Sequence, residues 1–158
     1  MITATSQGPQ VGVVAPDFTL DSTAGTPVTL SAFRGVQPVL LAFFPLAFTS
    51  VCTAELCSFT ENYDRFAAFN VAVVPISVDS VATLREYKAK LGLKIDLLSD
   101  FRRTVSRQYD VLLDEKFYSN RAYFLIDKAG VVRWAHVEAH PGLKRDDAEI
   151  LAEIAKLT

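Results

Sequence analysis

An uncharged segment, Val39–Phe44, is followed closely by a segment with the period of a helix, Thr53–Phe69. Such an uncharged run is typical of a central strand that is covered on both faces, and Pro45 ends it. Cys52 lies where the connecting loop enters the helix. Unpaired N–H groups and the positive end of the helix dipole favour an anion there, and only the thiolate of cysteine is a good nucleophile. The stretch therefore predicts a strand, a loop and a helix that hold Cys52 as a nucleophile.

The two sides of the predicted helix differ in composition. With successive residues turned by about 100°, one stripe of side chains falls within about 80° and should face the core. This stripe consists of Cys52, Leu56, Phe59, Tyr63 and Phe66. Glu55 lies just beside the stripe, whereas Cys57 lies on the far side among polar residues. The projection therefore predicts that the two cysteines point in different directions.

Strands and helices are predicted to alternate along the rest of the chain. The expected elements are a hairpin of Ala15–Leu20 and Val28–Leu30, a strand Val71–Asp79 bent at Pro75, a helix from Asp79-Ser80 to Gly92, a short strand Leu97–Leu98, a helix Phe101–Tyr109, a hairpin of Ala122–Asp127 and Val131–Val137, and a final amphipathic helix Lys144–Leu157. This order is typical of an α/β sandwich with one mixed sheet. No repeat or linker interrupts it, so we expect a single domain over residues 1–158.

Composition excludes several classes of function. Half of the 158 residues are hydrophobic and 22% are charged, as in one globular domain. A net charge of -2, without a Lys/Arg-rich run, argues against a nucleic-acid partner. Met1–Gln10 lacks the pattern of a signal peptide, and no apolar run approaches the roughly 20 residues that span a bilayer. Two cysteines do not make a secreted disulfide framework, so we expect a cytoplasmic protein without a membrane partner.

Arg121 and Thr49 are the candidate partners of the cysteine. Arg121 opens the otherwise apolar strand Ala122–Ile126, where a charge is costly unless it is paired, so a thiolate partner would explain it. Alternatively, Arg121 is a strand-end residue that reaches solvent. Thr49 could donate a hydrogen bond into the sulfur pocket, or could simply cap the helix. Position alone does not decide between these alternatives.

The combination of these residues resembles a known family. Pro45–Cys52 fits the P-x-x-x-T-x-x-C motif of the peroxiredoxins, and Glu55 follows at the family's interval. Asn120–Asp127 resembles the arginine-bearing strand of the family, and Ala15–Phe18 and Phe33–Gly35 extend the likeness over nearly the whole chain. The stretch around the motif is most similar to the alkyl hydroperoxide reductase E type.

This resemblance implies a thioredoxin-like three-layer sandwich, in which helices flank a central mixed sheet that carries an N-terminal hairpin extension. It also implies a thiol peroxidase that reduces hydrogen peroxide, organic hydroperoxides or peroxynitrite without a metal, flavin or haem. Cys52 would be the peroxidatic residue and would become a sulfenic acid. Arg121 and Thr49 would hold the peroxide oxygens, Pro45 would shield the sulfenic acid, and Glu55 would orient the arginine. Thioredoxin, a glutaredoxin-like protein or a low-molecular-weight thiol would be the reductant, and we expect a homodimer.

The role of Cys57 is open at this point. Its spacing from Cys52 resembles that of the Q-type, or bacterioferritin-comigratory, peroxiredoxins, in which such a cysteine resolves the sulfenic acid as an intramolecular disulfide. In an intact helix the α-carbons of the pair lie roughly 8–9 Å apart. A disulfide requires about 4.4–6.8 Å, so the first turns of the helix would have to unwind. The alternative is a one-cysteine enzyme, in which Cys57 is a bystander and an external thiol resolves Cys52.

Three other classes fit the sequence less well. A thiol–disulfide oxidoreductase of the thioredoxin kind needs a Cys-x-x-Cys motif, which is absent here. A zinc site made by Cys52, Cys57, His136 and His140 has loosely suitable spacings but leaves Arg121 without a role. A catalytically inactive interaction module on the same fold would leave the whole motif without a purpose.

Overall fold

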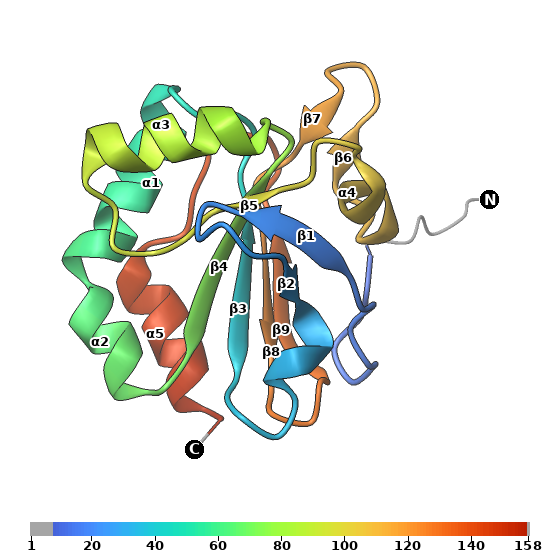
Figure 1. Cartoon of the computed structure of the whole chain (residues 1–158). Helices are drawn as coiled ribbons and strands as arrows, with labels where there is room; N and C mark the ends of the chain where they lie inside the picture. The colour runs from blue at the N-terminus through green and yellow to red at the C-terminus, as the bar shows by residue number, and fades with distance from the viewer. Residues whose placement is uncertain (1–7, 158) are drawn as a thin grey trace.

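The structure is a computed structural model that describes residues 8–157 (Figure 1). In chain order its elements are β1 (Thr19–Ser22), β2 (Val28–Thr29), the 3-10 helix η1 (Leu30–Phe33), β3 (Val39–Phe43), α1 (Ser50–Glu61), α2 (Tyr63–Ala68), β4 (Ala72–Ser77), α3 (Val81–Leu91), β5 (Leu98–Ser99), α4 (Thr104–Gln108), β6 (Leu112–Leu113), β7 (Tyr118–Ser119), β8 (Ala122–Ile126), β9 (Val132–Val137) and α5 (Asp147–Ala155).

Within residues 8–157 the strands form a seven-stranded sheet in the order β2-β1-β5-β4-β3-β8-β9, and β6 pairs with β7 alone. The pairs β3–β4 and β4–β5 are parallel and the other pairs of the large sheet are antiparallel, so the predicted mixed sheet is confirmed. All five residues of β3 are buried, as its uncharged sequence predicts. The loop after β3 thus leaves from the interior of the sheet.

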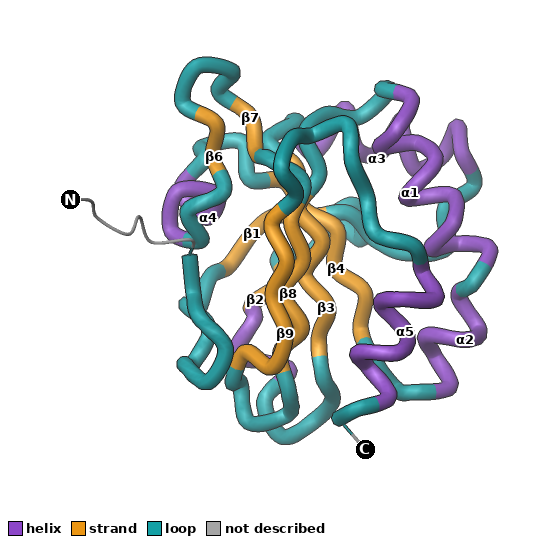
Figure 2. The backbone as a smooth tube through the Cα atoms, turned by 180° about the vertical axis from the view of Figure 1, so that it is seen from behind, coloured by secondary structure: helices purple, strands orange, loops and turns teal. Residues whose placement is uncertain are grey.

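The side chains of the sheet alternate between two apolar clusters. Leu40 and Ala42 face one side together with buried residues of α1, α2, α3 and α5. Leu41 and Phe43 face the other side, where they meet Val105 of α4 and the N-terminal segment around Phe18. Figures 1 and 2 show the four helices gathered on one side of the sheet and α4 on the other. The predicted three-layer sandwich is therefore confirmed. No helix among the described residues is long and apolar enough to cross a membrane.

The N-terminal hairpin is confirmed, with slightly shifted strands. Thr19 pairs with Thr29 in β1–β2, and Asp21 pairs with Ser99 of β5, so the hairpin extends the large sheet at one edge. The small hairpin β6–β7 was not predicted, because strands of two residues carry no readable alternation.

Helix ends follow their capping groups. Helix α3 begins at Ser80, whose side chain accepts a hydrogen bond from Thr83 N, and ends at Gly92 in the left-handed conformation, as predicted. Helix α4 is shorter than predicted, because the buried Asp100 carboxylate accepts from Val105 N and Ser106 N and so begins the helix later. Helix α5 is also shorter than the predicted Lys144–Leu157.

The predicted single helix Thr53–Phe69 is wrong, because the structure divides it into α1 and α2 at Asn62. The Asn62 side chain donates to both Ser58 O and the Asp147 carboxylate of α5, which holds the chain at the break. Tyr63, directly after the break, is 39% exposed and so does not belong to the predicted core stripe. The stripe is correct for Cys52 and Phe66, which are buried on either side of the break.

Of the bulge or bend expected at Pro75, the structure contains no bulge. The β3–β4 pairing runs without a shift through Ala42 and Pro75. Alternate residues of a parallel strand bond to opposite neighbours. Because Ala72 N donates to Pro38 O on the β3 side, Pro75 faces the β5 side, where pairing starts only at Ile76. Since β4 has no partner in β5 at this position, the missing N–H of Pro75 removes no hydrogen bond from the sheet.

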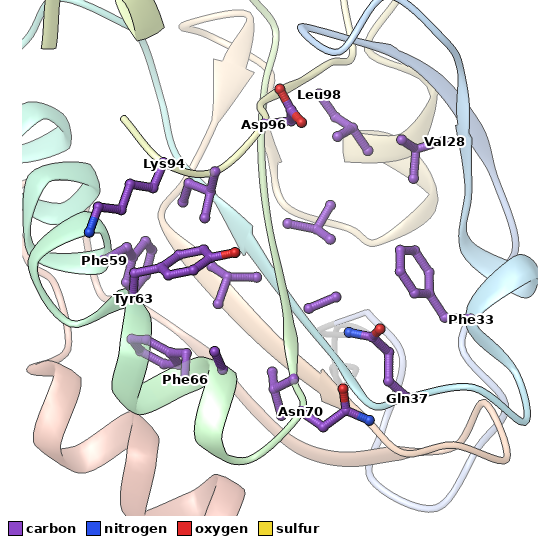
Figure 3. Close-up of a pocket in the computed structure, with 16 residues that line it drawn as sticks. Val28, Phe33, Gln37, Phe59, Tyr63, Phe66, Asn70, Lys94, Asp96 and Leu98 are labelled. Carbon is purple, nitrogen blue, oxygen red and sulfur yellow. The ribbon is translucent and has the colours of Figure 1, made fainter. Parts of the chain in front are cut away.

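A cavity of about 440 Å³ lies beside the first part of β4, which does not pair with β5 (Figure 3). Apolar residues of β4, α2 and the N-terminal hairpin line it, and Lys94 and Asp96 stand at its rim. Neither cysteine lines it.

The turn of the β8–β9 hairpin depends on Asp127. Its carboxylate accepts from Ala129 N at 2.9 Å, Val131 N at 3.0 Å and Arg133 Nε at 2.6 Å. Burial acts to raise the pKa of Asp127, but these donors outweigh it and hold the pKa below the ordinary 3.8.

We expect Asp127→Ala to lower the free energy of unfolding by about 1–2 kcal/mol at pH 7. Because the pKa is lower in the folded protein, the contribution is complete above pH 3.8 and is lost as the pH falls through the folded-state pKa. Urea unfolding at pH 7 and near pH 2 would measure this. Asp114→Ala, at an exposed loop position, is the control. An equal deficit at both pH values would contradict the assignment to the ionised carboxylate.

Candidate active site

Cys52 lies in the first turn of α1, where the loop from β3 meets the helix. It is 1% exposed and packs in the apolar cluster shared by α1, α3 and α5. Both cysteines are free thiols in the structure. The predicted strand–loop–helix arrangement around Cys52 is therefore confirmed.

The loop before Cys52 is held from β4. Asp79 Oδ2, just after β4, accepts from Ala47 N at 2.8 Å and from Ser77 Oγ at 2.7 Å. Phe48 has a left-handed backbone with φ of 65°, and its exposed ring contacts Tyr87 of α3 at 4.8 Å between centroids. A conformation that is unfavourable for phenylalanine persists where the surroundings determine it. The loop is thus fixed at both its backbone and its tip.

Arg121 reaches Cys52 from the start of β8. It is 1% exposed, and its Nη2 lies 3.1 Å from Cys52 Sγ. Its Nη1 donates to Glu55 Oε1 at 2.8 Å, and its Nε and Nη2 donate to Pro141 O. The alternative of a strand-end residue in solvent is therefore wrong for Arg121. Every nitrogen of the guanidinium has an acceptor.

The charges of this buried group support one another. Burial raises the pKa of Glu55, while Arg121 and the Tyr123 hydroxyl oppose the rise. Burial acts to lower the pKa of Arg121, but the Glu55 carboxylate and the Cys52 sulfur outweigh it and raise the pKa above its ordinary value. Arg121 therefore stays a cation, and it is surrounded by groups that carry or develop negative charge.

Thr49 and Pro45 flank the sulfur along the chain. Thr49 occupies the N-cap position of α1, but its side chain makes no capping bond. Its hydroxyl donates to Leu46 O at 2.8 Å, so the proton that was expected to point at the sulfur is used within the loop. Pro45 is buried directly after the strand. The expected roles of both residues toward a peroxide stay predictions.

Cys57 lies one and a half turns further along the same intact helix. It is half-buried and packs against the apolar cluster that contains Cys52, although its projection indicated the polar side. Since α1 is continuous from Ser50 to Glu61, a bond between the two sulfurs requires local unwinding.

The two histidines of the zinc alternative have other partners. His136 lies 3.2 Å from a Glu138 carboxylate oxygen and stacks on Trp134, and His140 Nδ1 accepts from Gly142 N. Among residues 8–157, no group of three or more His, Cys, Asp or Glu side chains could hold a metal ion. The arrangement of these side chains does not support a zinc site.

Sequence reasoning did not identify three contributors. They are Asp79, which holds the loop, Pro141, whose carbonyl accepts from Arg121, and Tyr123, whose hydroxyl donates to Glu55 Oε2. Tyr123 could have been found, because it shares the face of β8 with Arg121 and a buried tyrosine hydroxyl needs a partner. A loop carbonyl such as that of Pro141 has no sequence signal.

Comparisons with known proteins agree with one another. A family model described as the AhpC/TSA family matches residues 11–135. The chain is similar to alkyl hydroperoxide reductase E of Mycobacterium tuberculosis, at 37% identity over 150 residues that cover 94% of this chain and 97% of that protein. It is also similar to the chloroplastic peroxiredoxin Q of Oryza sativa subsp. japonica, at 36% identity over 79% of this chain and 58% of that protein.

Solved structures extend this likeness to the fold. The reduced 2-Cys peroxiredoxin of Plasmodium vivax matches with a TM-score of 0.86 at 35% identity, covering 93% of this chain and 81% of that chain.

Proposed function

Because this chain belongs to the AhpC/TSA family of peroxiredoxins and is a thiol-dependent peroxidase, we propose that Cys52 is the peroxidatic residue that carries its reaction. The observation that supports this most directly is the buried contact of 3.1 Å between Arg121 Nη2 and Cys52 Sγ. A cationic donor stabilises negative charge on the sulfur, and the thiolate is the form that attacks.

In the proposed reaction, the Cys52 thiolate attacks one oxygen of a hydroperoxide. The S–O bond forms as the O–O bond breaks, and the second oxygen leaves with the electron pair. It takes up a proton and departs as water or an alcohol, while Cys52 becomes a sulfenic acid. Arg121 stabilises the charge that moves onto the leaving oxygen. By resemblance to the family, Thr49 also holds the peroxide, Pro45 shields the sulfenic acid and Glu55 orients Arg121.

We assign the resolving step to Cys57. Its thiol attacks the Cys52 sulfenic acid, the disulfide forms and water leaves; an external dithiol or two thiols then reduce the disulfide. The half-buried position of Cys57 against the same apolar cluster supports this assignment. Thioredoxin, a glutaredoxin-like protein or a low-molecular-weight thiol would serve as the reductant.

The experiment that tests this assignment is intact-mass analysis after one equivalent of hydrogen peroxide. We expect the wild type to lose two mass units by forming a Cys52–Cys57 disulfide, whereas Cys57→Ser gains one oxygen on Cys52 and is recycled more slowly by thioredoxin. A wild type that carries a stable sulfenic acid without a disulfide would show that Cys57 is a bystander and an external thiol resolves Cys52. Cys57→Ser should then turn over like the wild type with every reductant.

We also propose that residues 1–158 form one catalytic domain that acts in the cytoplasm as a homodimer. The described residues support one domain, because both apolar clusters lie on the same sheet. The exposed aromatic side chains of Phe48, Phe101 and Phe117 are available for a contact between copies. Sedimentation of the reduced protein would test the dimer.

A further inference from the structure

Tyr123 of β8 connects the active site to the loop before α5. Its side chain is fully buried, on the sheet face that also carries Arg121. The hydroxyl has two partners, Arg145 N at 3.0 Å and Glu55 Oε2. A backbone N–H can only donate, so the hydroxyl oxygen accepts from Arg145 and its proton is directed at Glu55. The direction of this hydrogen bond therefore follows from the geometry.

Glu55 connects the Tyr123 hydroxyl to Arg121 through its two carboxylate oxygens. Its Oε2 accepts from Tyr123, and its Oε1 accepts from Arg121 Nη1 at 2.8 Å. With one oxygen held on each side, the carboxylate can neither rotate nor withdraw without losing a buried hydrogen bond. Arg121 in turn directs Nη2 at Cys52 Sγ, 3.1 Å away. Hydroxyl, carboxylate, guanidinium and sulfur thus form one continuous buried chain.

We propose that Tyr123 is a positioning residue for peroxide reduction, whose hydroxyl holds the Glu55 carboxylate in the orientation that aims Arg121 at Cys52. The inference rests on the proposed function of Cys52 and adds a residue that does not touch the reacting atoms itself. Arg145 N donates to the Tyr123 oxygen and so fixes that side of the hydroxyl, which leaves the proton for Glu55. The second bond, to Glu55, is the one that bears on the reaction.

The protonation state of Glu55 makes the proposed role of Tyr123 testable through the pH dependence of the oxidation rate. The groups that act on this carboxylate are Arg121 and Tyr123, from the start of β8 and from β8 itself, and Lys144 from the loop before α5. Burial and the nearby carboxylate raise the pKa of Tyr123, so its hydroxyl keeps the proton that it donates. Removing this donor raises the pKa of Glu55 further. A protonated Glu55 is neutral, so it loses the charge that holds Arg121.

The test is Tyr123→Phe, with stopped-flow Trp134 fluorescence following oxidation by hydrogen peroxide. We expect the rate constant at pH 7 to fall about 10-fold, as for a residue that acts through another. The ratio of wild-type to variant rate constants should grow as the pH is lowered from 7, because Glu55 takes up its proton at a higher pH in the variant. Tyr109→Phe, another buried tyrosine, whose hydroxyl donates to Pro16 O on the opposite face, is the matched control and should react like the wild type.

A second measurement separates positioning from packing. In the Glu55→Gln background, Tyr123→Phe should cause no further loss of rate, because the group it positions is gone. Equal rates in wild type and Tyr123→Phe, or a full further loss in the Glu55→Gln background, would overturn the inference. If Tyr123→Phe alone does not fold, the double variant is compared with Glu55→Gln, and a further loss of rate in the double variant overturns the inference. A wild type that does not react with peroxide would instead refute the function of Cys52.

Discussion

Cys52→Ser is expected to lose peroxide reduction by at least about 1,000-fold, because removing the nucleophile of a covalent mechanism leaves little of the rate. A serine hydroxyl in the same position is almost entirely protonated at neutral pH, so Arg121 has no anion to stabilise. The side chain is nearly isosteric and Cys52 is fully buried, so the fold should persist. The measurement is the stopped-flow rate constant for hydrogen peroxide, with circular dichroism to verify folding.

The matched control for this substitution is Cys57→Ser, which removes the other thiol from the same helix. It should react with the first equivalent of peroxide at the wild-type rate, because Cys57 has no part in the attack on the O–O bond. If Cys52→Ser kept a tenth of the rate, or if Cys57→Ser lost the first oxidation, the assignment of the peroxidatic residue would be wrong.

Arg121→Lys is expected to slow the oxidation step about 100-fold, the size of effect found when one donor to a developing negative charge is removed. Arginine contacts Glu55 with Nη1 and Cys52 with Nη2 at the same time. The single nitrogen of lysine cannot reproduce both contacts although it keeps the charge. The control is Arg133→Lys, since Arg133 pairs with Asp127 on the exposed side of β9 and should not affect the rate.

The buried ion pair of Arg121 and Glu55 also leads to a prediction about stability. Arg121→Gln leaves the buried Glu55 without its cation, which should cost about 3–5 kcal/mol of unfolding free energy. Adding Glu55→Gln should restore most of this stability but none of the activity, because the two amides can pair yet cannot stabilise a thiolate. Recovery of the oxidation rate in the double variant would contradict the role of Arg121.

Much of the candidate site could be predicted from local sequence. The Pro45–Cys52 motif lies within one strand–loop–helix unit, and the family comparison confirms the resemblance inferred from it. Arg121 was a candidate because a charge at the start of a buried strand needs a partner, and the structure provides Cys52 and Glu55. These inferences succeeded because each depends on burial and alternation, which short segments encode.

The features that the sequence analysis missed or predicted wrongly depend on contacts between segments that lie far apart in the chain. The helix from Thr53 breaks at Asn62 because Asp147, 85 residues later, accepts from the Asn62 side chain. Pro75 needs no bulge, because the β4–β5 pairing begins only after it. Tyr123 was not singled out within its apolar strand, because neither its own segment nor that of Glu55 indicates that the two meet.

The sequence by itself determined the order of strands and helices, the buried central strand and the placement of Cys52 at a helix start, because periodicity and helix-end chemistry act over a few residues. Only the tertiary structure decided that Arg121 and Tyr123 reach Cys52 and Glu55 of α1, across separations of 66 to 69 residues. The physical reason is burial. A lone carboxylate or guanidinium would be costly inside the protein, and only the pairing of β3 with β8 beneath α1 brings their partners within hydrogen-bond distance.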